Sequence, residues 1–293
     1  MFENASWIVH PENKLYEPVK FIKEIKPRGE IKSAKLHITS LGCYYAEING
    51  CRVGDFILAP GFTSRKRVQY QTYNVKKMIK DGANLEILVG DGWYNGKINF
   101  VVANDVPKAL ICQLDVVYAN GEKESVVSGS DWLAAKDKLR FSELYDGEIY
   151  DANHTDTPVF ACVLDHSKKI IVKQEGVYVK EQEKISPISI FKAPNGDTLV
   201  DFGQNMTGYF EFNVQAKSGD RVEFTVCEEL DKYGNFYNEN YRGAKARFEY
   251  VCKDGENTYK PRLAFWGFRY MRVDSFPVEI KKENISAIVV PRL

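Results

Sequence analysis

The sequence lacks several features that would place it in a common functional class. Its 40 Lys and Arg residues equal its 40 Asp and Glu residues, so no net field would attract nucleic acid or an anionic membrane. No apolar run approaches the roughly 20 residues that span a bilayer, and the first residues lack the basic start and apolar stretch of a secretory signal. We therefore expect no nucleic-acid partner, no membrane association and a cytoplasmic location.

Patterns that hold metals or cofactors are also missing. The six Cys residues are scattered without a C-x-x-C pair, and the four His residues have no metal-binding spacing. The sequence contains no phosphate-binding loop, dinucleotide fingerprint or G-x-S-x-G motif. We expect free, mostly buried thiols, no metal site and no cofactor.

What the sequence does contain is short segments of alternating apolar and polar residues, typical of strands with one solvated face. Clear examples are residues 35–39, 112–116, 209–214 and 221–226. Residues 67–73 interleave aromatic and polar side chains, and we interpret them as a strand with Val68, Tyr70 and Thr72 on one face rather than as a base-stacking surface. Helical turns are expected only near residues 75–81 and 131–133.

Turn-forming residues recur between these segments and predict hairpins, because Gly and Asn reach positive φ at low cost. They are Asn49-Gly50, Asn120-Gly121, Asn195-Gly196, Ser218-Gly219, Tyr233-Gly234 and Asp254-Gly255. The fold class predicted is all-β, with two antiparallel β-sandwich or jelly-roll domains. A polar, irregular stretch between residues 150 and 186 places the domains at 1–160 and 161–293.

Several longer motifs carry a family resemblance. They are Leu-Ala-Pro-Gly-Phe-Thr at 58–63, Arg-Val-Gln-Tyr-Gln-Thr-Tyr at 67–73, Gly-Asp-Gly-Trp-Tyr at 90–94, Asp-Phe-Gly-Gln-Asn-Met-Thr-Gly-Tyr at 201–209, Glu-Glu-Leu-Asp at 228–231 and Phe-Trp-Gly-Phe-Arg-Tyr at 265–270. In this order, from about Trp7 to Val290, they resemble the amino-terminal half of bacterial α-L-rhamnosidases.

The resemblance implies a galactose-binding-like jelly roll followed by a concanavalin-like β-sandwich. The reaction of that family is inverting hydrolysis of terminal α-L-rhamnosides, performed by a helical barrel that follows these segments and has no counterpart in these 293 residues. The partners implied are a rhamnose-containing glycan or glycoside and the catalytic barrel itself.

The densest acidic motif is Glu228-Glu229 with Asp231. Inverting glycosidases need two carboxyl groups about 6.5–9.5 Å apart, whereas neighbouring residues on a strand point to opposite faces. We therefore assign no catalytic residue and interpret these carboxylates as structural. The alternative is an enzyme in its own right that uses Glu228 or Asp231.

The best candidate for ligand binding is the loop Asp91, Trp93, Tyr94 and Asn95, because it combines aromatic faces with a carboxylate and an amide. An equally weighted alternative is a buried Trp93 that anchors a hairpin. The resemblance implies that such modules bind terminal L-rhamnose, in some cases with calcium. Residues 63–66 beside the loop lack carboxylates, so calcium is not expected here.

Gln204, Asn205 and Trp266 are the residues we expect to face the barrel, with Trp266 exposed. In the same region Phe268, Tyr270 and Met271 are expected in the core, and Arg269 and Arg272 are expected to pair with carboxylates. For Gln204 and Asn205 the favoured interpretation is that they satisfy backbone groups where a strand enters its sheet, and the position facing the barrel is the alternative.

The function predicted is a non-catalytic accessory or carbohydrate-binding part of an α-L-rhamnosidase. Two alternatives stay open: a free-standing protein that binds rhamnose-containing glycans, and an interaction subunit of a split rhamnosidase.

Overall fold

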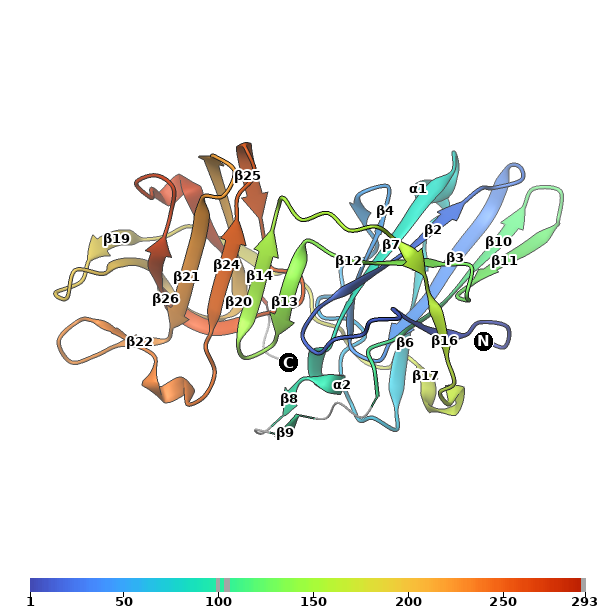
Figure 1. Ribbon diagram of the computed structural model, residues 1–293, viewed down its shortest axis with the longest axis horizontal. Coiled ribbons are helices and arrows are strands. Elements are labelled where there is room, and N and C mark those ends of the chain that lie inside the picture. The colour runs from blue at the N-terminus through green and yellow to red at the C-terminus, as the bar shows by residue number, and fades with distance from the viewer. Residues whose placement is uncertain (99–100, 103–105, 291–293) are drawn as a thin grey trace. The chain divides into compact units, whose positions relative to one another are not determined.

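The computed structural model describes residues 1–98, 101–102 and 106–290, and strands dominate it (Figure 1). The helical segments among these residues are single turns: α1 (Lys76–Ile79), α2 (Gly92–Asn95), η1 (Lys168–Ile170), η2 (Glu239–Tyr241) and η3 (Lys282–Asn284). The all-β prediction is confirmed. The helical turn expected near residues 75–81 is α1, whereas residues 131–133 form a turn that leads into a strand. The turn α2 was not expected.

The chain forms two compact units and passes between them three times. Unit 1 contains residues 1–137 and 156–178, and unit 2 contains residues 138–155 and 179–293. These units differ from the predicted segments 1–160 and 161–293. The physical reason is strand pairing, because residues 138–155 join the sheet of unit 2 and residues 161–178 supply edge strands to unit 1.

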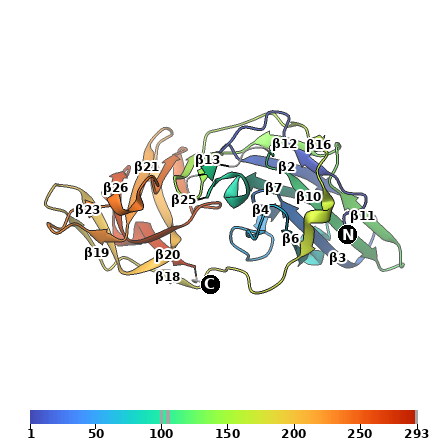
Figure 2. The same ribbon diagram turned by 90° about the horizontal axis from the view of Figure 1, so that it is seen from below.

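Unit 1 has two main sheets that pack as layers (Figure 2). The first has the order β16-β1-β10-β3-β6-β17, with β11 also paired to β10, and the second has the order β15-β12-β2-β7-β4-β5. The bounds are β1 (Trp7–Val9), β2 (Val19–Ile25), β3 (Ile31–Ser40), β4 (Cys43–Ile48), β5 (Cys51–Arg52), β6 (Val68–Asn74), β7 (Ala83–Gly90), β10 (Leu110–Tyr118), β11 (Lys123–Val127), β12 (Leu133–Lys136), β15 (Val159–Phe160), β16 (Cys162–Leu164) and β17 (Ile171–Lys173). A separate short pair joins β8 (Lys97–Ile98) to β9 (Val101–Val102).

Side chains from the two sheets of unit 1 meet in the space between them. The Tyr44 hydroxyl on β4 donates to Gln71 Oε1 on β6 at 2.7 Å, and it lies 3.0 Å from the Tyr73 hydroxyl. On the opposite face of the first sheet, Val68 and Tyr70 pack in a second cluster with Phe2 and Trp7. Both faces of β6 are therefore covered, although Thr72 at its far end is exposed.

Unit 2 is built on one continuous path of strands, β13-β14-β24-β21-β26-β20-β27-β18, with β19 and β25 also paired to β20. Its strands are β13 (Leu139–Glu143), β14 (Gly147–Asp151), β18 (Glu183–Ile185), β19 (Ser189–Lys192), β20 (Thr198–Ala216), β21 (Arg221–Cys227), β24 (Arg247–Val251), β25 (Gly255–Tyr259), β26 (Trp266–Ser275) and β27 (Ile285–Val289), and a separate pair joins β22 (Glu229–Leu230) to β23 (Phe236–Tyr237). The β14–β24 pair, like β6–β17 in unit 1, is parallel, which departs from the purely antiparallel expectation.

The 19-residue strand β20 pairs with four other strands of unit 2. Its first part pairs with β19 and β26, and from Gly208 onward it pairs with β27 and then β25. The pairing with β26 is interrupted between Asp201 and Met206 by a bulge. A bulge bends a strand and increases its twist. Across this bulge β26 remains the partner on one side, while the partner on the other side changes from β19 to β27.

The core of unit 2 is aromatic. Phe210 on β20 contacts Phe224 and Phe248 edge-on at centroid distances of 5.2 and 5.0 Å, and it stacks on Trp266 at 5.6 Å. Trp266 is therefore 5% exposed, and the prediction of an exposed Trp266 is wrong. The sequence could not show this, because the stacking partner lies 56 positions away on another strand. Phe268 and Met271 are buried as predicted, whereas Tyr270 is half-buried.

The six predicted turns lie where one strand ends and the next begins. Four of the six join strands that pair directly, namely β4–β5, β10–β11, β19–β20 and β22–β23. The turns at Gly219 and Gly255 join strands whose partners lie elsewhere in the sheet. Both glycines adopt a φ of +91°, as positive-φ turns require.

A buried carboxyl group ties β14 to a loop of unit 2. Glu148 Oε1 accepts from the backbone N–H groups of Leu263 and Arg262 at 2.6 and 3.0 Å, and Oε2 accepts from the Tyr259 hydroxyl at 3.0 Å. The side chain is 1% exposed. Burial raises the pKa of Glu148 to about 7 even though these bonds favour its ionised form.

We expect this carboxyl group to make stability depend on pH. The native state holds the proton more tightly than the unfolded chain, whose pKa is near 4.5, so the free energy of unfolding falls as pH rises from about 4.5 to about 7. The loss attributable to Glu148 is on the order of 3 kcal/mol. In Glu148→Gln, the amide oxygen still accepts both backbone bonds and this loss disappears. Urea denaturation of both proteins at pH 5 and pH 7.5 measures it; equal pH dependence in the two would contradict the assignment.

Candidate functional site

The candidate ligand loop begins where β7 ends. Asp91 directly precedes α2, and Gly92 has a φ of +52° with the backbone and side chain of Cys43 so close that a Cβ atom would clash. Glycine at this position is therefore a packing requirement. It lets the chain turn tightly from β7 into α2 against the start of β4.

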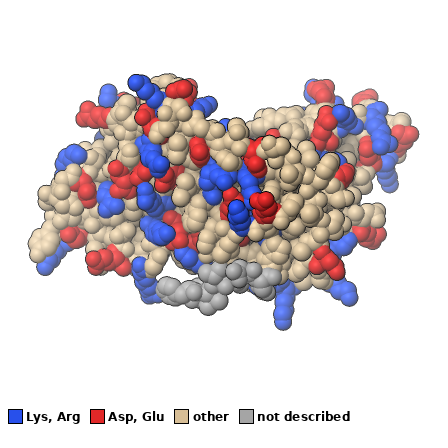
Figure 3. All heavy atoms as spheres, in the orientation of Figure 1, with Lys and Arg blue, Asp and Glu red and all other residues tan. Residues whose placement is uncertain are grey.

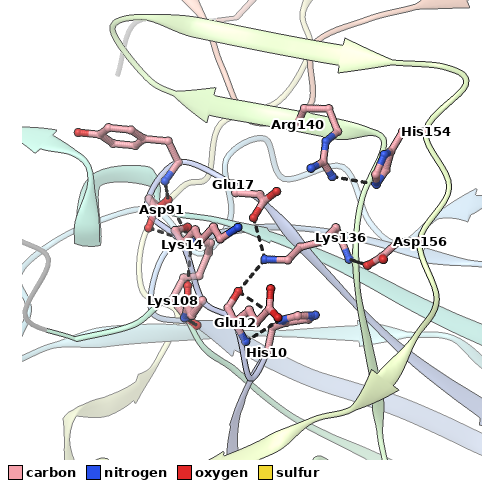
Figure 4. Close-up of polar contacts among 12 residues, drawn as sticks. His10, Glu12, Lys14, Glu17, Asp91, Lys108, Lys136, Arg140, His154 and Asp156 are labelled. Atoms are coloured by element: carbon pink, nitrogen blue, oxygen red, sulfur yellow. Dashed lines mark hydrogen bonds and ion pairs between the residues drawn. The ribbon is translucent and has the colours of Figure 1, made fainter.

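The carboxylate of Asp91 lies inside unit 1 (Figure 4). Its oxygens are 3.3 and 3.4 Å from Lys108 Nζ, and one accepts from the Tyr16 backbone N–H at 2.7 Å. Lys108 Nζ also donates to the Lys14 carbonyl at 2.6 Å and to Asn13 Oδ1 at 3.0 Å. Asp91 is 2% exposed and Lys108 is 1% exposed. This ion pair therefore fastens residues 13–16 to the end of β7.

Burial and pairing act on Lys108 in opposite directions. Desolvation lowers the pKa of Lys108, and the nearby Asp91 carboxylate partly opposes that effect. Next to this pair, Lys136 Nζ donates to Glu17 Oε2 at 2.7 Å and to the Glu12 carbonyl at 2.6 Å. The whole segment from residue 12 to residue 17 is thus held by buried or half-buried lysines.

Arg65 holds the other end of the loop. Its guanidinium lies 4.9 Å from the centroid of the Tyr94 ring, and it donates to the Tyr94 carbonyl at 3.1 Å and to Asn95 Oδ1 at 3.0 Å. Tyr94 is 5% exposed and belongs to the core cluster of Phe2 and Trp7. Asn95 is 1% exposed, and within the described residues its Nδ2 has no hydrogen-bond partner.

The structure therefore separates the four predicted ligand-binding residues. Asp91, Tyr94 and Asn95 are buried, whereas Trp93 is partly exposed. Sequence reasoning missed Arg65 and Lys108, which bind the loop from distant positions. Arg65 lies in residues 63–66 beside the loop, but no local pattern there indicates that its guanidinium reaches Tyr94 and Asn95. That this loop binds sugar stays a prediction.

The second predicted surface lies on unit 2. Gly203, Gln204 and Asn205 are exposed within the bulge of β20, and Asn205 Nδ2 donates to Glu228 Oε1 at 3.2 Å. The bulge is held by Asp201, which accepts from Arg269 Nε and a terminal guanidinium nitrogen at 2.9 and 3.0 Å and from the Gly203 N–H at 2.7 Å. The predicted pairing of Arg269 and Arg272 with carboxylates is confirmed, since Arg272 bonds Asp274. Gln204 and Asn205 are available for contact, and Trp266 is not.

The candidate catalytic carboxylates have local structural partners. Asp231 accepts from the backbone N–H groups of Tyr233 and Asn235 at 2.8 and 2.7 Å, which closes the turn between β22 and β23. Its pKa is lowered, first by the hydrogen bond from the Asn235 backbone. A carboxyl group with a lowered pKa is a poor general acid. Glu228 bonds Asn205, as described above, and Glu229 is exposed.

Other ligand classes find little support in the part of the chain that the structure describes. No group of three or more His, Cys, Asp or Glu residues there is placed to hold a metal ion, and no helix is long and apolar enough to cross a membrane. The six thiols are free, four of them buried and two, Cys51 and Cys162, exposed. On the face drawn in Figure 3, acidic and basic side chains are interspersed.

We expect the buried ion pair to contribute to stability through its pairing. Lys108→Met leaves the Asp91 carboxylate buried without its cation and should lower the free energy of unfolding by about 3 kcal/mol. The exposed Lys32→Met is the matched control and should change it by less than about 0.5 kcal/mol. Urea denaturation measures both. The double variant Asp91→Asn/Lys108→Met should be less destabilised than the sum of the single changes; strict additivity would show that the two groups do not interact.

Comparison with known proteins identifies two adjacent family domains in this chain. The model described as the α-L-rhamnosidase N-terminal domain matches residues 29–186, and the model of the bacterial α-L-rhamnosidase concanavalin-like domain matches residues 191–291. Among curated proteins, the chain is 36% identical over 282 residues to an α-L-rhamnosidase of Streptomyces avermitilis, which covers 90% of this chain and 27% of that protein.

Solved structures give the same result. The α-L-rhamnosidase of Aspergillus terreus superimposes with a TM-score of 0.93 and 29% identity, over 99% of this chain and 36% of that one. The Streptomyces avermitilis α-L-rhamnosidase complexed with L-rhamnose superimposes with a TM-score of 0.87 and 34% identity, over 94% of this chain and 28% of that one. The chain thus spans about a third or less of the length of these relatives.

Proposed function

Because the chain belongs to the bacterial α-L-rhamnosidase family, we propose that it forms the non-catalytic β-sandwich portion of an enzyme that hydrolyses terminal α-L-rhamnosides. The observation that carries the proposal is the match of two adjacent family domains over nearly the whole chain. In this proposal the two units support the catalytic part and contribute to holding a rhamnose-containing substrate.

The chemistry of the described residues supports a non-catalytic role. Inversion requires an acid and a base carboxyl group on opposite sides of the scissile bond, about 6.5–9.5 Å apart. The acidic residues that sequence reasoning singled out are engaged in a turn at Asp231 and in a side-chain bond at Glu228. The groups that remain exposed in the bulge, Gln204 and Asn205, are amides, which bind and do not titrate.

Sugar binding at the Trp93 loop is the second part of the proposal. Trp93 is partly exposed on a loop that Asp91 and Arg65 hold in place from inside. Rigid placement lowers the entropic cost of binding, which favours a stacked sugar. That the Streptomyces avermitilis relative was solved in complex with L-rhamnose is consistent with a rhamnose ligand for this family.

The bulge of β20 is the surface that we assign to the catalytic part. Gln204 and Asn205 are exposed there on a backbone that the Arg269–Asp201 pair keeps in one conformation. Exposed amides on a fixed backbone are suited to a polar protein interface.

We expect no turnover of an aryl α-L-rhamnoside by the purified 293-residue chain, because the two candidate catalytic carboxylates, Glu228 and Asp231, are engaged by local structural partners. A colorimetric assay over several hours measures it, with a full-length α-L-rhamnosidase as the positive control. Activity that is lost in Glu228→Gln or Asp231→Asn would overturn the non-catalytic assignment.

We expect L-rhamnose to bind weakly at the loop, with a dissociation constant on the order of 0.1–1 mM, since few ligand atoms are engaged. Trp93→Ala should abolish the chemical-shift changes that L-rhamnose causes and leave the rest of the amide spectrum intact. Tyr233→Ala, which removes an exposed aromatic ring from unit 2, is the control and should leave the changes unaltered. Absence of shifts at tens of millimolar rhamnose, or unfolding of Trp93→Ala, would make Trp93 a structural anchor.

A further inference from the structure

Unit 1 contains a groove of about 650 Å³ whose lining does not include the Trp93 loop. Two unbroken runs of residues form most of the lining, residues 23–28 at the end of β2 and residues 124–131 at β11 and the loop after it. Successive side chains of a strand point to opposite faces of the sheet, so a groove over one face of the sheet would be lined by every second residue of a strand. This groove is lined by consecutive residues of both runs. We therefore infer that it runs along the edges of β2 and β11.

Among the described residues, no strand pairs with the edge of β11 that faces away from β10. The Ser128 N–H donates to the Cys112 carbonyl at 3.0 Å, and the Tyr118 N–H donates to the Glu122 carbonyl at 2.9 Å. Because hydrogen-bonded positions alternate in an antiparallel pair, Glu124 and Val126 also bond β10, and Ser125 directs its N–H and C=O outward. The Trp132 indole, which donates to the outward Val127 carbonyl at 2.9 Å, agrees with this alternation.

A second unpaired edge lies across the groove in the other sheet. β12 pairs with β2 only from Val19 to Ile22, whereas β2 continues to Ile25 and remains paired with β7 to that point. At Lys23–Ile25, the edge of β2 on the side of β12 therefore has no strand partner among the described residues. The groove lies where each of the two sheets ends in an open edge.

The lining indicates which ligand fits. Between the edges, Val116 and Ile25 are buried, and Val163 on β16 is 54% exposed. The charged groups at the rim are already paired, Lys23 with Asp131, Lys26 with Glu24 and Arg28 with Glu124. The three cations and three anions of the rim balance, so no net charge favours a charged ligand over an uncharged one, and an open strand edge bonds an extended backbone.

We propose that this groove is a strand-addition site, in which an extended, uncharged peptide segment of a partner protein pairs with the outer edge of β11 and directs alternate apolar side chains between the two sheets. The edge from Lys123 to Val127 is about 17 Å long at about 3.4 Å per residue. The segment bonds the outward backbone groups of Lys123 and Ser125 and the Val127 N–H, because the Val127 carbonyl remains bonded to the Trp132 indole. Its other face lies against β2. This site is independent of the sugar-binding role proposed for the Trp93 loop.

The test uses the full chain and a short acetylated, amidated peptide of alternating serine and valine. Titration should cause saturable chemical-shift changes at the amides of residues 23–28 and 123–128. Ser125→Pro removes the outward N–H without removing a bond to β10, and it should raise the dissociation constant about tenfold, the equivalent of one hydrogen bond. Ser125→Ala keeps the N–H and loses only the bond from Ser125 Oγ to Asp115, so it should bind within about twofold of the unmodified protein.

A second measurement does not depend on how Ser125→Pro folds. In the unmodified protein, bound peptide should slow hydrogen exchange of the Ser125 amide about tenfold, while the Val126 amide, already bonded to β10, should change little. No shifts at millimolar peptide, equal binding by the two Ser125 variants, or equally tight binding of a lysine–valine peptide would each overturn the proposal. So would a neutral rhamnose oligosaccharide that shifts these amides when the peptide does not.

Discussion

Unit 2 depends on a single long strand, β20, that pairs with four others. β20 pairs with β19 and β26 before its bulge, remains paired with β26 as far as Gly208, and then pairs with β27 and β25, so one backbone connects these four strands around the aromatic core. The bidentate Arg269–Asp201 pair and the Gly203 N–H hold the bend. Gly203 has a φ of +85°, which disfavours other residues. The same bend that shapes the core exposes Gln204 and Asn205.

Local sequence patterns predicted much of the fold, because period-two alternation and Gly-containing turns are local signals. The hairpins at Asn49-Gly50 and Asn120-Gly121 are examples. Non-local features could not be predicted in this way. The stacking of Trp266 on Phe210 and the parallel pairing of β14 with β24 join positions far apart in sequence. The division of the chain into units depends on such pairings and differs from the predicted one for that reason.

The candidate site was also only partly predictable from local sequence patterns. The sequence singled out a loop with an aromatic residue, a carboxylate and an amide, but it could not show which way each side chain points. Lys108 and Tyr16 draw the Asp91 carboxylate into the interior, and Arg65 does the same for the Asn95 oxygen. Asp91, Tyr94 and Asn95 are therefore buried residues that hold the loop in place. Of the four predicted ligand-binding residues, Trp93 is the one that is partly exposed.

The order of the units along the chain has a consequence for synthesis and for dissection of the protein. Residues 138–155 belong to unit 2 but are made before the last strands of unit 1, β16 and β17. During translation β13 and β14 can pair with each other, but the other edge of β14 has no partner until β24 is synthesised almost a hundred residues later. A fragment limited to the matched span 191–291 would lack Glu148 and leave the N–H groups of Arg262 and Leu263 without their acceptor. Neither unit is a continuous stretch of sequence, so any single fragment that holds all of one unit also carries a segment of the other.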